Sequence, residues 1–120
     1  MTTNHDDATP VADLGDDDFD DAIHGRWTTV DLWATWCGPC RRFMPAFEAA
    51  AREHADSVGQ LGFARVNVDD NPAIAERVAP KCIPTVVLYD PDGNEVTRAS
   101  GFLGPDDLAE VLDHLPAGVR

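Results

Sequence analysis

The chain has 120 residues, which is enough for one compact domain and too few for two. Its 22 acidic residues against 9 basic ones give a formal net charge of −13, which argues against nucleic acid and other polyanions as partners. No stretch approaches the roughly 18 consecutive apolar residues of a membrane-spanning helix, so we expect no membrane partner.

Residues 1–9 are predicted to be an acidic disordered tail, and residues 10–120 a single domain. The chain begins MTTNHDD, which has neither the basic nor the apolar region of a secretory signal peptide. We therefore expect a cytoplasmic protein whose thiols are kept reduced. The many acids have two interpretations: a solvated surface, or an adaptation to high salt, where screening removes their mutual repulsion.

The first elements are read from apolar patterning. Residues 10–14 predict a short strand, and a helix follows from about Asp16, with acids in its first turn. Gly25 should end this helix. Residues 28–34 then predict a buried strand that only Asp31 interrupts.

Two cysteines follow that strand in the motif Trp36-Cys37-Gly38-Pro39-Cys40. Residues 41–52 are rich in Ala and predict a helix that runs to about Asp56, with a kink at Pro45. Cys37 would lie at the helix N-terminus, where unpaired backbone N–H groups favour a thiolate. Cys40 would lie one turn further in, within disulfide reach but deeper. This placement predicts that Cys37 attacks and Cys40 resolves.

The rest of the chain completes an alternating pattern. Its predicted elements are a strand over 63–68, a helix from Asn71-Pro72 to about Val78, strands over 85–89 and 95–99, and a helix from near Pro105. The order βαβαβαββα predicts an α/β fold with a mixed central β-sheet and helices on both faces. We expect the functional edge at the carboxyl ends of the central parallel strands, where Cys37 emerges.

Several landmarks together resemble one family. They are Val30-Asp31-Leu32-Trp33-Ala34, Trp36-Cys37-Gly38-Pro39-Cys40, Pro45, Ile83-Pro84-Thr85 and Gly101. Over about residues 11–115 the chain resembles the thioredoxin family, and the C-x-x-C motif near a βαβ pattern is typical of it. The resemblance implies the thioredoxin fold and a protein-disulfide reductase that needs no cofactor beyond the redox-active disulfide of its two cysteines. It also implies a monomer whose partners are disulfide-containing proteins and a thioredoxin reductase or equivalent electron donor.

The resemblance also implies roles for single residues. Pro84 aligns with the cis-proline that lies against the active-site disulfide and leaves the backbone of Ile83 free to pair with an extended substrate. The residues predicted to contact substrate are Trp36, Gly38, Pro39, Ile83, Pro84 and Gly101.

Asp31 is the third predicted catalytic residue. A carboxylate in an apolar strand is costly unless it is neutral or paired, so burial should raise its pKa and suit it to take and return the proton of Cys40. The resemblance places Asp31 beneath the cysteines and Arg65 near it. The alternative is a surface acid on an edge strand.

Other interpretations compete with this one. The cysteines could be half of a zinc site with His54, but residues 57–60 supply no second histidine, so we expect redox chemistry and no metal. Cys82 is interpreted as a buried small apolar residue, with a reactive thiol as the alternative. An oxidase or isomerase, and a binding module without catalysis, compete with the reductase; the Gly-Pro pair between the cysteines resembles the reducing members of the family.

Overall fold

A computed structural model of the chain describes residues 10–54 and 60–119. The predicted tail over 1–9 and the predicted helix end at Asp56 lie outside the described residues. The elements are β1 (Val11–Asp13), α1 (Phe19–Ala22), β2 (Trp27–Trp33), α2 (Gly38–Glu53), β3 (Leu61–Asn67), α3 (Pro72–Val78), β4 (Thr85–Tyr89), β5 (Glu95–Ser100) and α4 (Pro105–Leu112). The predicted order is confirmed.

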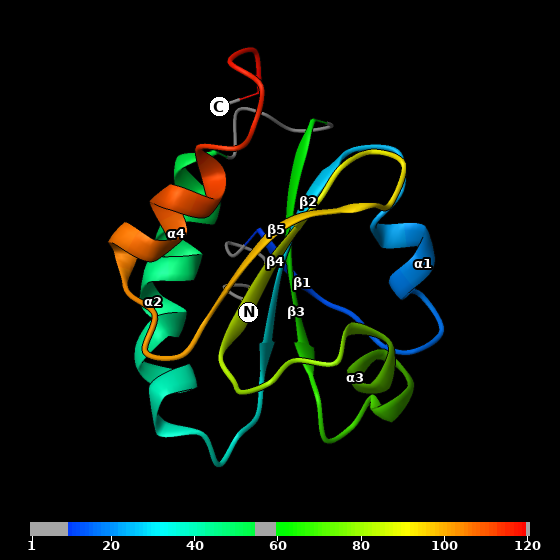
Figure 1. Cartoon of the computed structure of the whole chain (residues 1–120), viewed down its shortest axis with the longest axis vertical. Helices are drawn as coiled ribbons and strands as arrows, with labels where there is room; N and C mark the ends of the chain where they lie inside the picture. Colours follow the sequence, from blue (N-terminus) through cyan, green and yellow to red (C-terminus); the bar gives the residue numbers. More distant parts are fainter. Residues whose placement is uncertain (1–9, 55–59, 120) are drawn as a thin grey trace, which may run out of the picture.

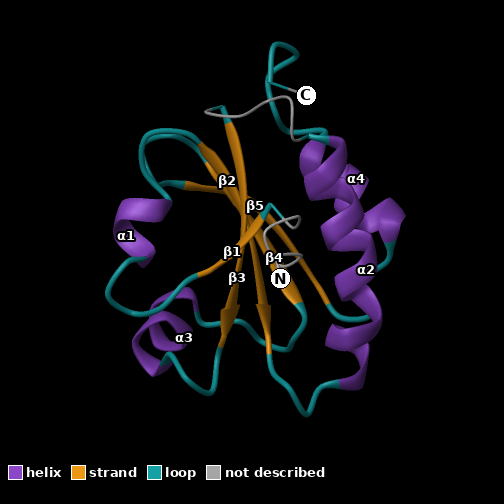
Figure 2. Cartoon of the chain, turned by 180° about the vertical axis from the view of Figure 1, so that it is seen from behind, coloured by secondary structure: helices purple, strands orange, loops and turns teal. Residues whose placement is uncertain are grey.

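The strands form one five-stranded sheet in the order β1-β3-β2-β4-β5. β1, β3 and β2 are parallel, whereas β4 runs antiparallel to β2 and β5 antiparallel to β4. Helices α2 and α4 cover one face of the sheet, and α1 and α3 cover the other (Figure 1; Figure 2). The predicted mixed sheet with helices on both faces is therefore correct, and β2 is its central strand.

Strand alternation divides the apolar residues into two cores. Under α2 and α4, Phe47 packs edge-on against Phe63 of β3, with ring centroids 5.5 Å apart. On the other face, Phe19 of α1 packs edge-on against Tyr89 of β4 at 5.8 Å. Each core closes one face of the sheet. None of the described helices is long and apolar enough to cross a bilayer.

Helix α1 begins at Phe19, later than the sequence predicts. Asp16, the expected start of this helix, binds the start of α3 with its side chain. The Asp16 carboxylate accepts the backbone N–H groups of Ala73 at 3.4 Å and Ile74 at 3.0 Å, at the start of α3. Asn71 is the N-cap residue of α3, as predicted, but its side chain accepts the N–H of Asp16 at 3.1 Å and makes no capping hydrogen bond to α3 itself. The start of α3 is thus capped across the fold, which local sequence rules did not predict.

Two breaks in regularity were also predicted from the sequence. Gly25 ends the α1 region with a φ of +96°, a conformation that glycine adopts without steric penalty. Pro45 lies inside α2, which continues to Glu53, so the proline does not end the helix, and the kink expected there stays a prediction. Beyond its first turn, α2 packs on the sheet through the buried side chains of Phe43, Phe47 and Ala51.

Candidate active site

Cys37 and Cys40 form a disulfide at the start of α2, with their Cα atoms 5.2 Å apart. Strand β2 ends at Trp33, and Cys37 is the N-cap of the helix that follows. Pro39 lies in the first helical turn, where its missing N–H leaves no helical hydrogen bond unmade. The strand-to-helix turn predicted from the sequence is therefore where the two sulfurs lie.

The two sulfurs have different surroundings. Cys37 Sγ accepts the backbone N–H of Cys40 at 3.1 Å. Cys40 is completely buried, whereas Cys37 keeps 4% of its surface exposed. A donor aimed at Cys37 Sγ at a helix N-terminus stabilises negative charge on that sulfur rather than on Cys40. The predicted difference in depth is confirmed.

A loop from the other side of the sheet lies against Cys37. The Ile83–Pro84 peptide bond is cis, and the Ile83 carbonyl oxygen lies 3.8 Å from Cys37 Sγ. Within the described part of the chain, no backbone–backbone hydrogen bond uses Ile83. The Gly101 N–H donates to the Pro84 carbonyl at 3.1 Å, and Gly101 has a φ of +103°. The structure thus brings Pro84 and Gly101 together beside the disulfide.

Two exposed aromatic side chains flank this region in sequence. Trp36, directly before Cys37, is 67% exposed, and its indole N–H donates to the Asp69 carboxylate at 2.8 Å. Phe102, directly after Gly101, is 85% exposed. Sequence reasoning missed Asp69 and Phe102, although Asp69 follows the carboxyl end of β3, the edge at which the cysteines were expected. The sequence signal available for Phe102 was its position directly after Gly101, a predicted contact residue.

Asp31 is buried in the central strand, so the alternative of a surface acid on an edge strand is wrong. Neither carboxylate oxygen has a hydrogen-bond partner. Burial raises the pKa of Asp31 from its ordinary 3.8 to about 8, and the positive charge of Arg65 opposes that rise. Its register partners are Arg65 of β3 and Val86 of β4, and Val86 belongs to the core under α2 and α4. Asp31 therefore faces the helix that carries Cys40.

Cys82 departs from its prediction. It is an exposed free thiol rather than a buried apolar residue, since the Thr85 hydroxyl holds its carbonyl at 2.6 Å while its side chain stays outside the core. His54 lies at the opposite end of α2 from the cysteines and bonds to the Ala50 carbonyl at 2.9 Å. Within 10–54 and 60–119, no group of three or more metal-binding side chains occurs.

Comparison with known proteins agrees with this geometry. The family model named Thioredoxin matches residues 10–114. A thioredoxin from Staphylococcus aureus is 38% identical over 103 residues, which cover 86% of this chain and 95% of that protein. Among solved structures, a Malassezia sympodialis thioredoxin aligns with a TM-score of 0.77 at 31% identity over 88% of this chain and 91% of that one. A Plasmodium falciparum thioredoxin aligns with a TM-score of 0.76 at 26% identity over 86% and 97%.

Proposed function

The chain belongs to the thioredoxin family of thiol–disulfide oxidoreductases and carries out dithiol–disulfide exchange, and on this premise we propose that Cys37 is the attacking sulfur and Cys40 the resolving one. The observation that carries the assignment is the asymmetry of the pair: only Cys37 retains exposed surface, and Cys37 Sγ receives the helix-end N–H. A buried sulfur reaches only a partner that is already bound.

The exchange has two steps. The Cys37 thiolate attacks one sulfur of a target disulfide, forms a Cys37–target disulfide, and releases the other target sulfur as a thiolate that is then protonated. The Cys40 thiolate attacks Cys37 Sγ, which breaks the mixed disulfide and releases the second target thiol. Two electrons pass to the target, and the Cys37–Cys40 disulfide remains.

Substrate docking is proposed to use the cis-proline loop. Because Ile83 makes no backbone–backbone hydrogen bond within the described chain, its peptide groups are available to an extended segment that carries the target disulfide. Further contacts to the target would come from residues around the two sulfurs. The proposed set is Trp36, Gly38, Pro39, Ile83, Pro84 and Gly101, and the exposed Phe102 is added to it.

Asp31 is proposed to exchange a proton with Cys40. Cys40 must lose its proton before it can attack, and it is buried away from water. A carboxyl whose pKa is about 8 changes ionisation near neutral pH, which suits a group that takes and returns a proton. The relay would therefore limit the second step rather than the first.

The proposal also covers the partners, the oligomeric state and the cellular location of the protein. The thioredoxin family implies a reductase partner and disulfide-containing substrates. We infer that a thioredoxin reductase or an equivalent donor returns the two electrons, that no cofactor beyond the disulfide takes part, and that the protein works as a monomer. The cytoplasm is the proposed location because thiols are kept reduced there. Residues 10–120 would form the thioredoxin domain.

Trapping of targets tests the sulfur assignment. Cys40→Ser, combined with Cys82→Ala to remove the exposed thiol, should hold target proteins on Cys37 as disulfides that dithiothreitol releases. Cys37→Ser with Cys82→Ala should capture none. Equal capture by the two variants would overturn the assignment. Catalysed reduction of insulin by the unaltered protein with dithiothreitol tests turnover, and its absence would favour a binding module.

A further inference from the structure

Three ionisable residues form one row across the sheet. Asp13 of β1 and Asp31 of β2 are both register partners of Arg65, which lies on β3 between them. Register partners in parallel strands point to the same face, so one guanidinium has a carboxyl group on each side. From its position in the sheet, Arg65 could pair with either Asp13 or Asp31.

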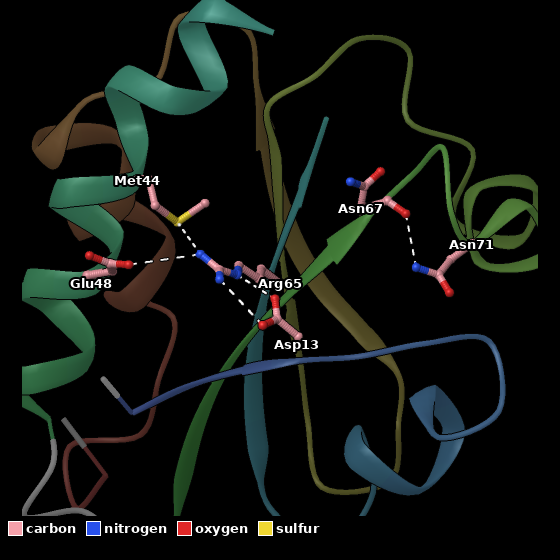
Figure 3. A network of polar contacts seen from close by, with 6 residues as sticks. All are labelled: Asp13, Met44, Glu48, Arg65, Asn67 and Asn71. Atoms are coloured by element: carbon pink, nitrogen blue, oxygen red, sulfur yellow. Dashed lines mark hydrogen bonds and ion pairs between the residues drawn. The ribbon is translucent and has the colours of Figure 1, made fainter. Parts of the chain in front are cut away.

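Arg65 is paired with Asp13. Its Nε donates to Asp13 Oδ1 at 2.5 Å and its Nη2 to Asp13 Oδ2 at 3.4 Å, while its Nη1 lies 3.9 Å from the Glu48 carboxylate of α2 and 3.7 Å from the Met44 sulfur (Figure 3). Asp31 receives no hydrogen bond. The guanidinium therefore acts on Asp31 only through its field.

Solvation explains why Arg65 pairs with Asp13 and not with Asp31. The Asp13 side chain is 70% exposed and ionises in water without loss of hydration, whereas Asp31 is completely buried and must lose its hydration to ionise. A bidentate contact to a carboxylate that is already charged is the stronger bond for a guanidinium. Competition between an exposed acid and a buried one thus decides where Arg65 lies.

We propose that Asp13 is a positioning residue for the proton relay: by holding Arg65 toward the edge strand β1, it limits the pull of the guanidinium on Asp31 and so sets how readily the Asp31 carboxyl ionises and can accept the proton of Cys40. This inference rests on the proposed function only for the role of Asp31 as a relay. The effect on Asp31 ionisation stands without it.

Few other charges act on Asp31. Helix α2 contributes Cys40 and Glu48 above the sheet, and β3 contributes Arg65. On β4 the register partner of Asp31 is Val86, which carries no charge. The residues that α4 buries against this face are likewise apolar. In the described chain, Arg65 is the charge that opposes the rise in the pKa of Asp31.

The test measures Asp31 ionisation directly, by carboxyl ¹³C NMR of the whole oxidised protein across pH 5 to 10. Asp13→Asn frees Arg65 from its counter-charge, so the Asp31 midpoint should fall by about half a pH unit. Arg65→Gln should move the midpoint upward by a similar amount. An unchanged midpoint in Asp13→Asn overturns the proposal.

Asp20→Asn is the matched control. Asp20 pairs with Arg77 at 2.5 Å, its side chain is 69% exposed, and Arg77 lies over the Phe19 ring at 5.4 Å much as Arg65 lies over the Trp33 ring at 5.5 Å. This pair lies at the surface beside Phe19, which belongs to the core on the far face of the sheet from Asp31. Its loss should leave the Asp31 midpoint in place, and an equal shift would mean that any lost surface acid suffices.

A double-mutant cycle separates the route through Arg65 from a direct field of Asp13. With Arg65→Gln already present, Asp13→Asn should produce at most a small further shift; a full shift would overturn the positioning role. The same variants are then assayed for collapse of the mixed disulfide across pH. If the Asp31 midpoint moves and the collapse profile does not follow it, the positioning of Arg65 is upheld and the relay fails.

Discussion

The two faces of strand β2 differ in whether their buried polar groups are satisfied. Toward α1 and α3, Val30 and Leu32 are completely buried in an apolar core. Toward α2, the hydroxyl of Thr29, both carboxyl oxygens of Asp31 and the indole N–H of Trp33 are buried without hydrogen-bond partners. Unsatisfied buried groups of this kind cost about 1–3 kcal/mol each. The face that serves the cysteines is therefore less favourable for stability than the face that only packs.

The largest expected effect comes from replacing the buried acid. Asp31 has a pKa of about 8 in the folded chain and 3.8 as its ordinary value, so between these pH values the folded chain holds a proton that the unfolded chain has lost. The stability contributed by Asp31 is present below about pH 4 and is lost as pH rises toward 8, by about 1.4 kcal/mol per pH unit. Asp31→Asn should therefore be increasingly more stable than the parent as pH rises.

Urea unfolding of the oxidised proteins at pH 4, 6 and 8 checks this. Subtraction of the parent curve removes the titration of the histidines and surface acids, which both proteins share. A difference that does not change with pH would show that Asp31 is not the titrating group. The same variant should slow the collapse of the mixed disulfide more than the first attack, measurable by stopped-flow tryptophan fluorescence.

The opposite face should respond in the opposite direction. Leu32→Ala removes a fully buried side chain from the core that α1 and α3 close, and it should lower the free energy of unfolding by about 2–4 kcal/mol. This loss should be the same at pH 4 and pH 8, because no titratable group is removed. A loss under about 1 kcal/mol would contradict the description of this face as close-packed.

Thr28 and Thr29 lie on opposite faces of β2, and substituting each should have a smaller effect than the changes above. The Thr29 hydroxyl has no partner, so Thr29→Val should stabilise the chain by about 1 kcal/mol. The Thr28 hydroxyl donates to the carbonyls of Ala22 and Arg26, each at 3.2 Å, so Thr28→Val should destabilise it by about 1 kcal/mol. Both changes keep side-chain volume. Urea unfolding should separate the two in sign, and equal signs would contradict the contrast between the faces.

Added salt should raise the stability of the whole chain and should not distinguish the two faces of β2. Because 13 net negative charges repel one another across the surface, the melting temperature of the parent should rise from low to molar KCl. The difference between the two threonine variants should not change, since buried groups are screened little. A melting temperature that does not move with KCl would contradict the adaptation to high salt.

Much of the fold was predictable because its signals are local. Apolar and β-branched runs placed the strands, and the C-x-x-C motif after a strand placed both sulfurs at a helix start. Cys82 and Asn71 show where local signals failed. The exposure of Cys82 depends on how the cis-proline loop lies against Cys37, and the side chain of Asn71 is used by a loop 55 residues away.

The sequence by itself determined the order of the elements, the strand that carries Asp31, and the motif whose two cysteines differ in depth, because each depends on neighbours within about one helical turn or one strand pair. The tertiary structure alone decided which groups Asp31, Arg65 and Asp13 meet. Arg65 lies 34 residues from Asp31 along the chain and pairs with Asp13, 52 residues away. That choice follows from strand register and from the difference in hydration between an exposed and a buried carboxyl, which only the packed chain establishes.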